Sequence, residues 1–221
     1  MDQQIVYAVI FLCIFLLLVG ISHLLHSWFN VSSENSRKFL HVSGGFLALG
    51  SPLFFTSHWW VLVLCILSFL LLFTTYVMHC LPAVHQTRRK SIGSVVYPIP
   101  VYICFFVAMY KSNHLLFYLP VSLLTVSDTM AELGGKKWGA RSKQLMKKQK
   151  TVAGSISFAV SALIISLVWS GAVNLPLRQV ALISITITLI ATTAEMISTK
   201  GWDNITVPLS ALLCLLLLLE D

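Results

Sequence analysis

Long apolar runs separated by short polar connections are the feature that most constrains how this chain can fold. The first run extends from Ile5 to Leu25, and about 20 apolar residues are enough to cross a bilayer as a helix. Of the 221 residues, 57% are hydrophobic and 10% are charged, against about a quarter charged in a soluble domain. Helices satisfy their own backbone hydrogen bonds inside hydrocarbon. The sequence therefore predicts an all-α polytopic membrane bundle, a single integral membrane domain covering residues 1–221.

Eight apolar segments are candidates for membrane-spanning helices. The second and the last are short, so seven spans are also possible. All the connections between them are too short to form a separate soluble nucleotide-binding domain. The candidates are residues 4–26, 38–56, 59–79, 93–110, 114–133, 152–171, 178–198 and 204–219.

Basic residues gather on alternate connections between these segments. All but two of the 15 Lys and Arg residues lie on the odd-numbered connections, and the exceptions are Lys111 and Arg178. Because cytoplasmic loops are enriched in Lys and Arg, the odd-numbered connections are predicted to face the cytoplasm of a bacterial cell, with both termini outside. This bias and the attraction of anionic headgroups account for the net charge of +7, so no nucleic-acid partner is expected.

Four acidic residues lie near the cytoplasmic ends of three predicted helices: Asp128, Glu132, Glu195 and Asp203. A carboxylate well inside a spanning helix costs about 2.5–3.5 kcal/mol on insertion scales, so it usually faces a bundle interior, a water-filled cavity or a partner. Asp128 and Glu132 are four residues apart and share a helix face, where they repel each other unless a cation lies near. Mg²⁺ binds carboxylates together with substrate phosphates. The four residues are therefore candidate magnesium ligands, although Asp203 could simply cap a helix.

A short hairpin joins the last two predicted helices. It separates Glu195 at the end of one helix from Asp203 and Asn204 at the start of the next. The two helix ends are therefore expected to be neighbours in space. Oxygen ligands from this hairpin would add to the metal site of the fifth helix.

Glycines and basic residues on the same face suit phosphate binding. The glycines after the fifth helix predict a tight turn that lets the backbone approach a ligand, unless they only cap the helix. Lysines bind phosphate as point charges, and hydroxyls at a helix start could add donors, although a polybasic loop facing headgroups has the same composition. The Walker A spacing is absent. The candidates for nucleotide or phosphate binding are Gly134, Gly135, Lys136, Gly139, Lys150, Thr151, Gly154, Ser155, Arg89, Lys90 and Ser94.

A further basic group opens the second predicted helix, where Arg37 and His41 lie four residues apart and Lys38 follows Arg37. This group could bind phosphate or could only anchor the helix to headgroups. Carboxylates, phosphate-binding cations and glycines on one face suit phosphoryl transfer, which needs mainly positioning and charge neutralisation. The second substrate would be a lipid whose hydroxyl reaches the interface.

In their order along the chain, these motifs resemble the polyprenol kinase family, which includes dolichol kinase, phytol kinase and the CTP-dependent diacylglycerol kinases. The resemblance implies a kinase that uses CTP and Mg²⁺ to phosphorylate a membrane alcohol. It also implies catalytic roles for Arg37, Lys38, Asp128 and the Gly134–Gly139 turn, to which we add Glu195, while His41 and Asn204 are candidates for contacts to the lipid. Whether Asp128 is a base or a metal ligand stays open. The matching pieces, within about residues 36–210, are Arg37-Lys38…His41, Arg89-Lys90-Ser91…Gly93-Ser94, Asp128…Gly135…Gly139, Lys150-Thr151…Gly154-Ser155 and Glu195…Asp203-Asn204…Pro208.

Other functions compete with the lipid kinase. The middle motif is also similar to part of the phosphatidate cytidylyltransferases, so transfer of a cytidylyl group to make a CDP-lipid is the second hypothesis. The longer C-terminal motifs of those enzymes are missing here. A transporter would also place carboxylates in the membrane, but the charges lie on one face and no inverted repeat is evident. A non-catalytic membrane scaffold is the third alternative. The lipid and the oligomeric state stay open.

Overall fold

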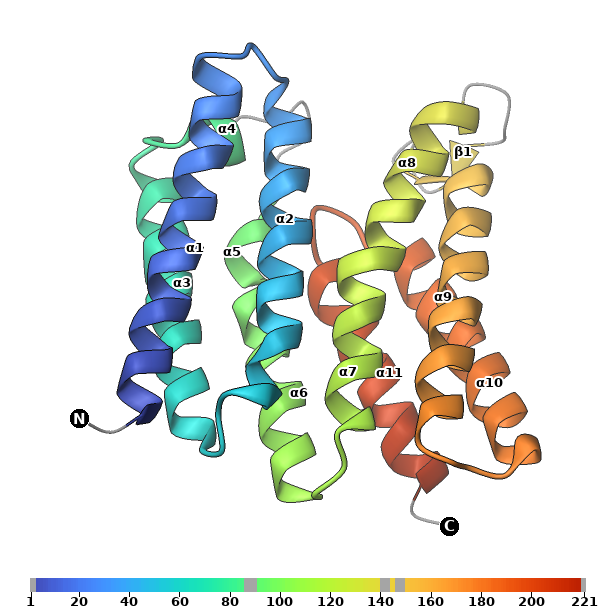
Figure 1. The fold of residues 1–221 in the computed structure, drawn as a ribbon. Helices are drawn as coiled ribbons and strands as arrows, with labels where there is room; N and C mark the ends of the chain where they lie inside the picture. The colour runs from blue at the N-terminus through green and yellow to red at the C-terminus, as the bar shows by residue number, and fades with distance from the viewer. Residues whose placement is uncertain (1–2, 86–90, 140–143, 146–149, 220–221) are drawn as a thin grey trace.

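The computed structural model describes residues 3–85, 91–139, 144–145 and 150–219, and nearly all of them are helical (Figure 1). Two short strands, β1 (Gln144–Leu145) and β2 (Lys150–Thr151), pair in antiparallel fashion. The helices are α1 (Gln3–Ser27), α2 (Ser33–Gly50), η1 (Ser51–Leu53), α3 (His58–Val77), α4 (Pro82–His85), α5 (Gly93–Val96), α6 (Pro98–Tyr110), α7 (Leu115–Ser122), η2 (Leu123–Ser127), α8 (Asp128–Trp138), α9 (Val152–Ala172), α10 (Leu177–Ile197) and α11 (Asp203–Leu219).

The predicted all-α polytopic membrane bundle is confirmed. Among the described residues, five helices are long and apolar enough to cross a membrane: α1, α3, the α5–α6 pair, α9 and α10. The other three predicted segments are also helical, as α2, as the run α7–η2–α8 and as the 17-residue α11. The exact number of spans stays a prediction.

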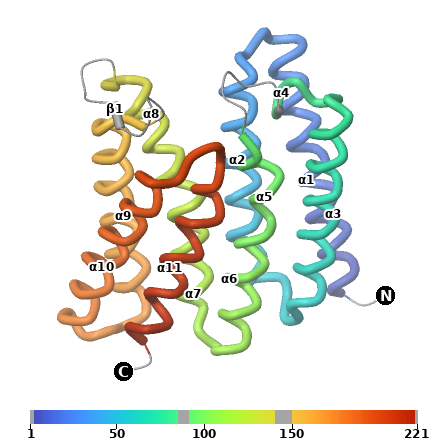
Figure 2. The backbone as a smooth tube through the Cα atoms, turned by 180° about the vertical axis from the view of Figure 1, so that it is seen from behind, coloured from blue at the N-terminus to red at the C-terminus, as the bar shows by residue number. Residues whose placement is uncertain are grey.

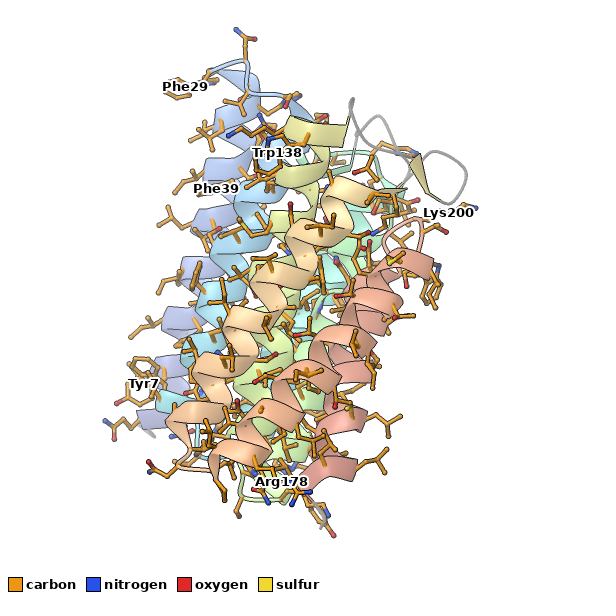
Figure 3. All side chains as sticks on the ribbon, turned by 90° about the vertical axis from the view of Figure 1, so that its right-hand side faces the viewer. Tyr7, Phe29, Phe39, Trp138, Arg178 and Lys200 are labelled. Carbon is orange, nitrogen blue, oxygen red and sulfur yellow. The ribbon has the colours of Figure 1, made fainter. Side chains whose placement is uncertain are left out.

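Both ends of the chain lie at the same end of the bundle (Figure 1). In Figure 3, Tyr7 and Arg178 lie near this end, while Trp138 and Lys200 lie near the opposite one. The separation agrees with the predicted gathering of the basic connections at one end, which we call the polar end. That the polar end faces the cytoplasm stays a prediction.

Helix α7 forms the centre of the bundle, and its side chains are almost all buried. It contacts α2, α6, α9 and α11, and Phe117 packs edge-to-face on Phe105 of α6 with ring centroids 5.5 Å apart. Seen from behind, α11 lies beside α5 and α6 on one side and α10 on the other, so that it joins the two halves of the bundle (Figure 2). Large apolar side chains of α1, α3, α9 and α10 face outward, as expected for surfaces in lipid.

A π-helical turn, η2, interrupts the long helical run just before Asp128. Pro120 inside α7 removes a backbone donor, and the N–H of Asp128 bonds to the carbonyl of Leu123, five residues back. The Thr125 hydroxyl also donates to the Val121 carbonyl at 2.8 Å. Single π-turns inside helices often occur at functional sites. Here the turn directly precedes Asp128, which lies at the polar end.

The predicted turn at Gly134–Gly139 is wrong, because helix α8 continues to Trp138. Its glycines let α8 approach α9 closely instead. A Cβ at Gly134 would overlap the side chain of Ser157, and one at Gly135 would lie 3.2 Å from Thr151 Oγ1. Small residues have this role between membrane helices. Among the described glycines, only Gly201 has a positive φ, of 91°.

The α8–α9 contact predicts that Gly134→Val destabilises the fold. The added side chain would collide with Ser157, and overpacking of this kind costs about 1–3 kcal/mol. The control is Gly171→Val in α9, where a Cβ meets no atom within 4 Å. Unfolding of both purified variants in mixed detergent micelles would measure the difference, and equal losses would contradict the close contact.

Candidate functional site

A cavity of about 450 Å³ opens at the polar end, between α2 and α5 on one side and α8, α9 and α11 on the other. It gathers most of the residues that the sequence marks as functional, although they come from five separate parts of the chain. The predicted residues that line it are Arg37, Lys38, His41, Ser94, Asp128, Glu132, Gly135, Lys136, Lys150, Thr151, Gly154, Glu195, Asp203 and Asn204.

Three of the predicted residues that the structure describes do not line the cavity. Gly134 is buried between α8 and α9, and Gly139 lies against Thr151. Ser155 is buried and donates to Glu195 Oε2 at 3.2 Å, so it supports a lining residue. Arg89 and Lys90 lie outside the described residues.

Lys150 forms the central ionic contact of the site. Its ammonium lies 2.6 Å from Glu195 Oε1 and 2.8 Å from Asp203 Oδ2. Glu195 is only 2% exposed and Lys150 15%, so this network is strengthened by weak solvent screening. The expectation that the two helix ends meet is confirmed, because one lysine binds both.

The charge of Lys150 is held firmly in this network. Burial lowers the pKa of its ammonium, but the carboxylates of Asp203, Glu195 and Asp128 outweigh burial and raise the pKa above its ordinary value. Lys150 precedes α9, and the next residue, Thr151, caps that helix by accepting a bond from the N–H of Gly154 at 3.1 Å. The same short segment therefore starts α9 and supplies the cation.

The hairpin between α10 and α11 positions Asp203. Lys200 has a φ of 58° and Gly201 a φ of 91°, a left-handed pair that reverses the chain sharply. The Lys200 carbonyl accepts a bond from the N–H of Ile92 at 3.1 Å. A Cβ at Gly93 would lie 2.7 Å from the side-chain nitrogen of Asn204. The segment around Ile92 and Gly93, at the start of α5, thus packs against this hairpin and fixes its position.

A second group of charges joins α2 to α8. Glu132 Oε1 lies 3.0 Å from the Lys38 ammonium and 2.7 Å from that of Lys136. Lys136 also lies 3.3 Å from Glu34. The predicted phosphate-binding lysines are therefore paired with carboxylates in this structure. Glu34 was missed, because its partner on α8 is far away in the sequence.

Asp128 lies deep in the cavity beside His41. One carboxylate oxygen is 3.7 Å from His41 Nε2, which is 2.9 Å from the Leu124 carbonyl. A carbonyl only accepts, so Nε2 carries the proton of this bond. The His41 ring packs edge-to-face on Tyr97, and the Tyr97 hydroxyl lies 3.0 Å from Thr125 Oγ1. The π-turn, α2 and α5 together fix the surroundings of Asp128.

Asp128 has the least compensated charge of the four carboxylates. Lysines contact Glu132, Glu195 and Asp203, whereas among the described residues only the His41 ring lies within 4 Å of the Asp128 carboxylate as a possible cation. The carboxylates of Asp203, Glu132 and Glu195 repel that of Asp128, and only the more distant Lys150 attracts it. A cation near Asp128 would relieve this repulsion.

The carboxylate set fits Mg²⁺ by its chemistry, since that ion prefers oxygen ligands and shares them with phosphates. In this conformation, no three His, Cys, Asp or Glu side chains of the described residues come close enough together to hold a metal ion by themselves. Lysines lie between the carboxylates. The ligand set Asp128, Glu132, Glu195 and Asp203 stays a prediction.

Arg37 is free to bind an anion. Within the described residues no carboxylate lies within salt-bridge distance of its guanidinium, although it lines the cavity. The planar fork of five donors suits a phosphate group. Thr129 and Thr199, which also line the cavity, were not predicted, and Ser91 was noted only as part of a motif. No local pattern marks these hydroxyl residues, and only the tertiary arrangement brings them to the cavity.

Two curated proteins are similar to this chain. A phytol kinase from Synechocystis sp. is 22% identical over 183 residues, which cover 82% of this chain and 78% of the relative. A phosphatidate cytidylyltransferase from Rickettsia prowazekii is 35% identical over 80 residues, which cover 36% of this chain and 35% of the relative. The chain is related to these lipid-modifying enzymes. The predicted resemblance to the polyprenol kinase family is thereby confirmed, at low identity.

Two other comparisons give no relative. No protein-family model matches the chain, and no solved structure matches it.

The central ionic contact predicts a large stability loss for Lys150→Met. The change would leave Glu195 and Asp203 without their cation, and breaking a buried pair costs about 3–5 kcal/mol. Because the pKa of Lys150 is raised, its contribution is present below about pH 10 and is lost as the pH rises through the folded-state pKa. The difference in unfolding free energy should therefore be the same at about pH 6 and about pH 9.

The matched control is Lys136→Met. Lys136 is 40% exposed, and exposed pairs contribute about 0–1 kcal/mol. Unfolding in mixed detergent micelles would compare the two variants. Equal losses for Lys150→Met and Lys136→Met would show that the network around Glu195 is not the stronger one.

Proposed function

We propose that the protein is a CTP-dependent lipid kinase that transfers the γ-phosphate of CTP to the hydroxyl of a membrane alcohol, of the polyprenol, phytol or diacylglycerol type. The observation that carries the proposal is the cavity at the polar end. It combines five carboxylates with Arg37, Lys38, Lys136 and Lys150 beside membrane helices. The similarity to a phytol kinase supports the same chemistry.

The cations would hold the triphosphate. Among the described residues, Arg37 contacts no carboxylate that it would have to release, whereas Lys38 and Lys136 would exchange Glu132 for phosphate oxygens. Charge-assisted hydrogen bonds from such groups are about twice as strong as neutral ones. Lys150 would stay with Glu195 and Asp203 and keep the cavity wall in place.

The carboxylates would hold Mg²⁺ together with the nucleotide, with Asp128 and Asp203 as the first ligands. The ion, when bound, supplies neutralisation of the phosphate charges. The acceptor hydroxyl must lose a proton as the phosphate is transferred. Nε2 of His41 does not accept this proton, because Nε2 already carries one and donates it to the Leu124 carbonyl. Asp128 is therefore the residue whose loss would affect transfer most.

Labelled CTP tests this function. Purified protein in lipid nanodiscs is mixed with Mg²⁺, a panel of lipid alcohols, phosphatidate, and CTP that carries label in either the γ- or the α-phosphate. The lipid kinase transfers the γ-label to an alcohol and leaves the α-label in CDP. Labelled CDP-lipid formed from phosphatidate and the α-label would overturn the kinase. Absence of label from every lipid would exclude both reactions.

Asp128→Asn and Glu34→Gln provide the matched variants for this assay. Asp128→Asn should lower γ-transfer by about 10²–10⁴-fold, the range for loss of a positioned acid or base. Glu34→Gln alters a half-exposed carboxylate that contacts only Lys136 among the described residues, so it should change the rate less than about threefold. If Asp128 is a metal ligand, the Mg²⁺ concentration for half-maximal activity also rises in Asp128→Asn, whereas a base would leave it unchanged.

Phosphatidate cytidylyltransferase is the second candidate function. The local similarity to the enzyme from Rickettsia prowazekii, at 35% identity, favours it. The match covers only 35% of that enzyme, and both reactions would place a cytidine triphosphate beside the same carboxylates. The α-label distinguishes them.

A further inference from the structure

A second, apolar cavity of about 110 Å³ lies beside the polar one, between α1, α2, α3 and the α5–α6 pair. Its walls include Phe11, Leu40, Val61, Leu72 and Val101. We call it the apolar slot. Such a cavity is far larger than the 10–15 Å³ needed for a water, but apolar walls give water no partners.

The apolar slot and the polar cavity meet. Arg37, His41 and Ser94 line both of them, so one side of these residues faces the carboxylates and the other faces hydrocarbon. A molecule with a polar head and an apolar chain could occupy both spaces at once. This continuity is what distinguishes the slot from an ordinary packing defect.

The slot borders much of α2. Its lining residues on this helix run from Arg37 to Ala48, and Ser51 of η1 also lines it. At 1.5 Å per residue, Arg37 to Ala48 corresponds to about 17 Å of helix.

Gly44 keeps the slot open. It lines the slot on α2, and a Cβ at this position would meet no atom within 4 Å. The next residue, Gly45, differs, because a Cβ there would collide with Thr125 and Tyr97. The neighbouring helices thus require a glycine at 45 but not at 44. A larger side chain at 44 would project into the slot itself.

We infer that the apolar slot binds the hydrocarbon chain of the acceptor alcohol. This inference rests on the proposed function, because it places the hydroxyl at Arg37, His41 and Ser94, on the side of Asp128.

Photo-crosslinking tests the slot without any phosphate transfer. A single-chain alcohol with a diazirine in its chain is added to the protein in nanodiscs, irradiated, and located by mass spectrometry. Labels should fall on slot residues of α1, α2 or α3 and saturate at a fixed ratio of alcohol to phospholipid. Labels spread over the outer faces of α9 and α10, without saturation, would show binding of bulk lipid and overturn the inference.

Gly44→Leu and Gly20→Leu are the matched pair for this test. Both change a helical glycine whose Cβ would meet no atom within 4 Å, but Gly20 does not line the slot. Gly44→Leu should lower crosslinking to the slot at least about tenfold, while Gly20→Leu keeps it. Both should keep the shift in melting temperature caused by CTP with Mg²⁺, which reports an intact polar cavity. Undiminished crosslinking in Gly44→Leu would overturn the inference.

The inference about the slot and the proposed kinase activity can be refuted separately. Slot labelling that Gly44→Leu abolishes, in a protein that transfers no γ-label, would support the slot and refute the proposed activity. Transfer of the γ-label without slot labelling would support the activity and refute the slot.

Discussion

The contact of Lys150 with Glu195 and Asp203 is the interaction on which the rest of the site depends. It ties the start of α9 to the end of α10 and the start of α11 at distances of 2.6 and 2.8 Å. Unpaired, a carboxylate as buried as Glu195 would carry a heavy desolvation cost. With the lysine present, three helix ends converge on one point, and that convergence forms one wall of the cavity.

The opposite wall is held by a different pairing. Lys38 on α2 and Lys136 on α8 both bind Glu132, across the boundary between the two halves of the bundle. These lysines have less buried partners than Lys150 does, so they are the ones that can be redirected. A triphosphate could take them from Glu132 without dismantling the wall at Lys150. The proposed structural and substrate-binding cations thus differ in the burial of their carboxylate partners, while Lys38 and Lys150 themselves are similarly buried.

The sequence was sufficient to predict the helices, because apolar length alone determines where a chain can cross a bilayer. It was also sufficient to predict that Asp128, Glu132, Glu195 and Asp203 lie at the same end of the bundle, where they line the cavity. It could not reveal the role of Gly134 and Gly135. These glycines pack on Thr151 and Ser157, at the start of α9, and 13 residues separate the end of α8 from that helix. The partners of Lys150 lie 45 and 53 residues away, a separation that no local pattern encodes.

The apolar slot shows the same limit more strongly. Its walls come from apolar positions on α1, α2 and α3 that look like any lipid-facing positions in the sequence. Only the tertiary arrangement shows that Gly44 faces open space while Gly45 is tightly packed. The positions of the charged residues could therefore be predicted from the sequence, whereas the shape of the cavity could not.

Photo-labelling with an azido analogue of CTP is the most direct measurement of the central claim, that the polar cavity is the nucleotide site. The account predicts Mg²⁺-dependent labels, competed by CTP, on peptides that contain residues 36–41, 128–139, 150–155 or 199–204, which line the cavity. Labels confined to other peptides, or labels that excess CTP does not displace, would contradict it.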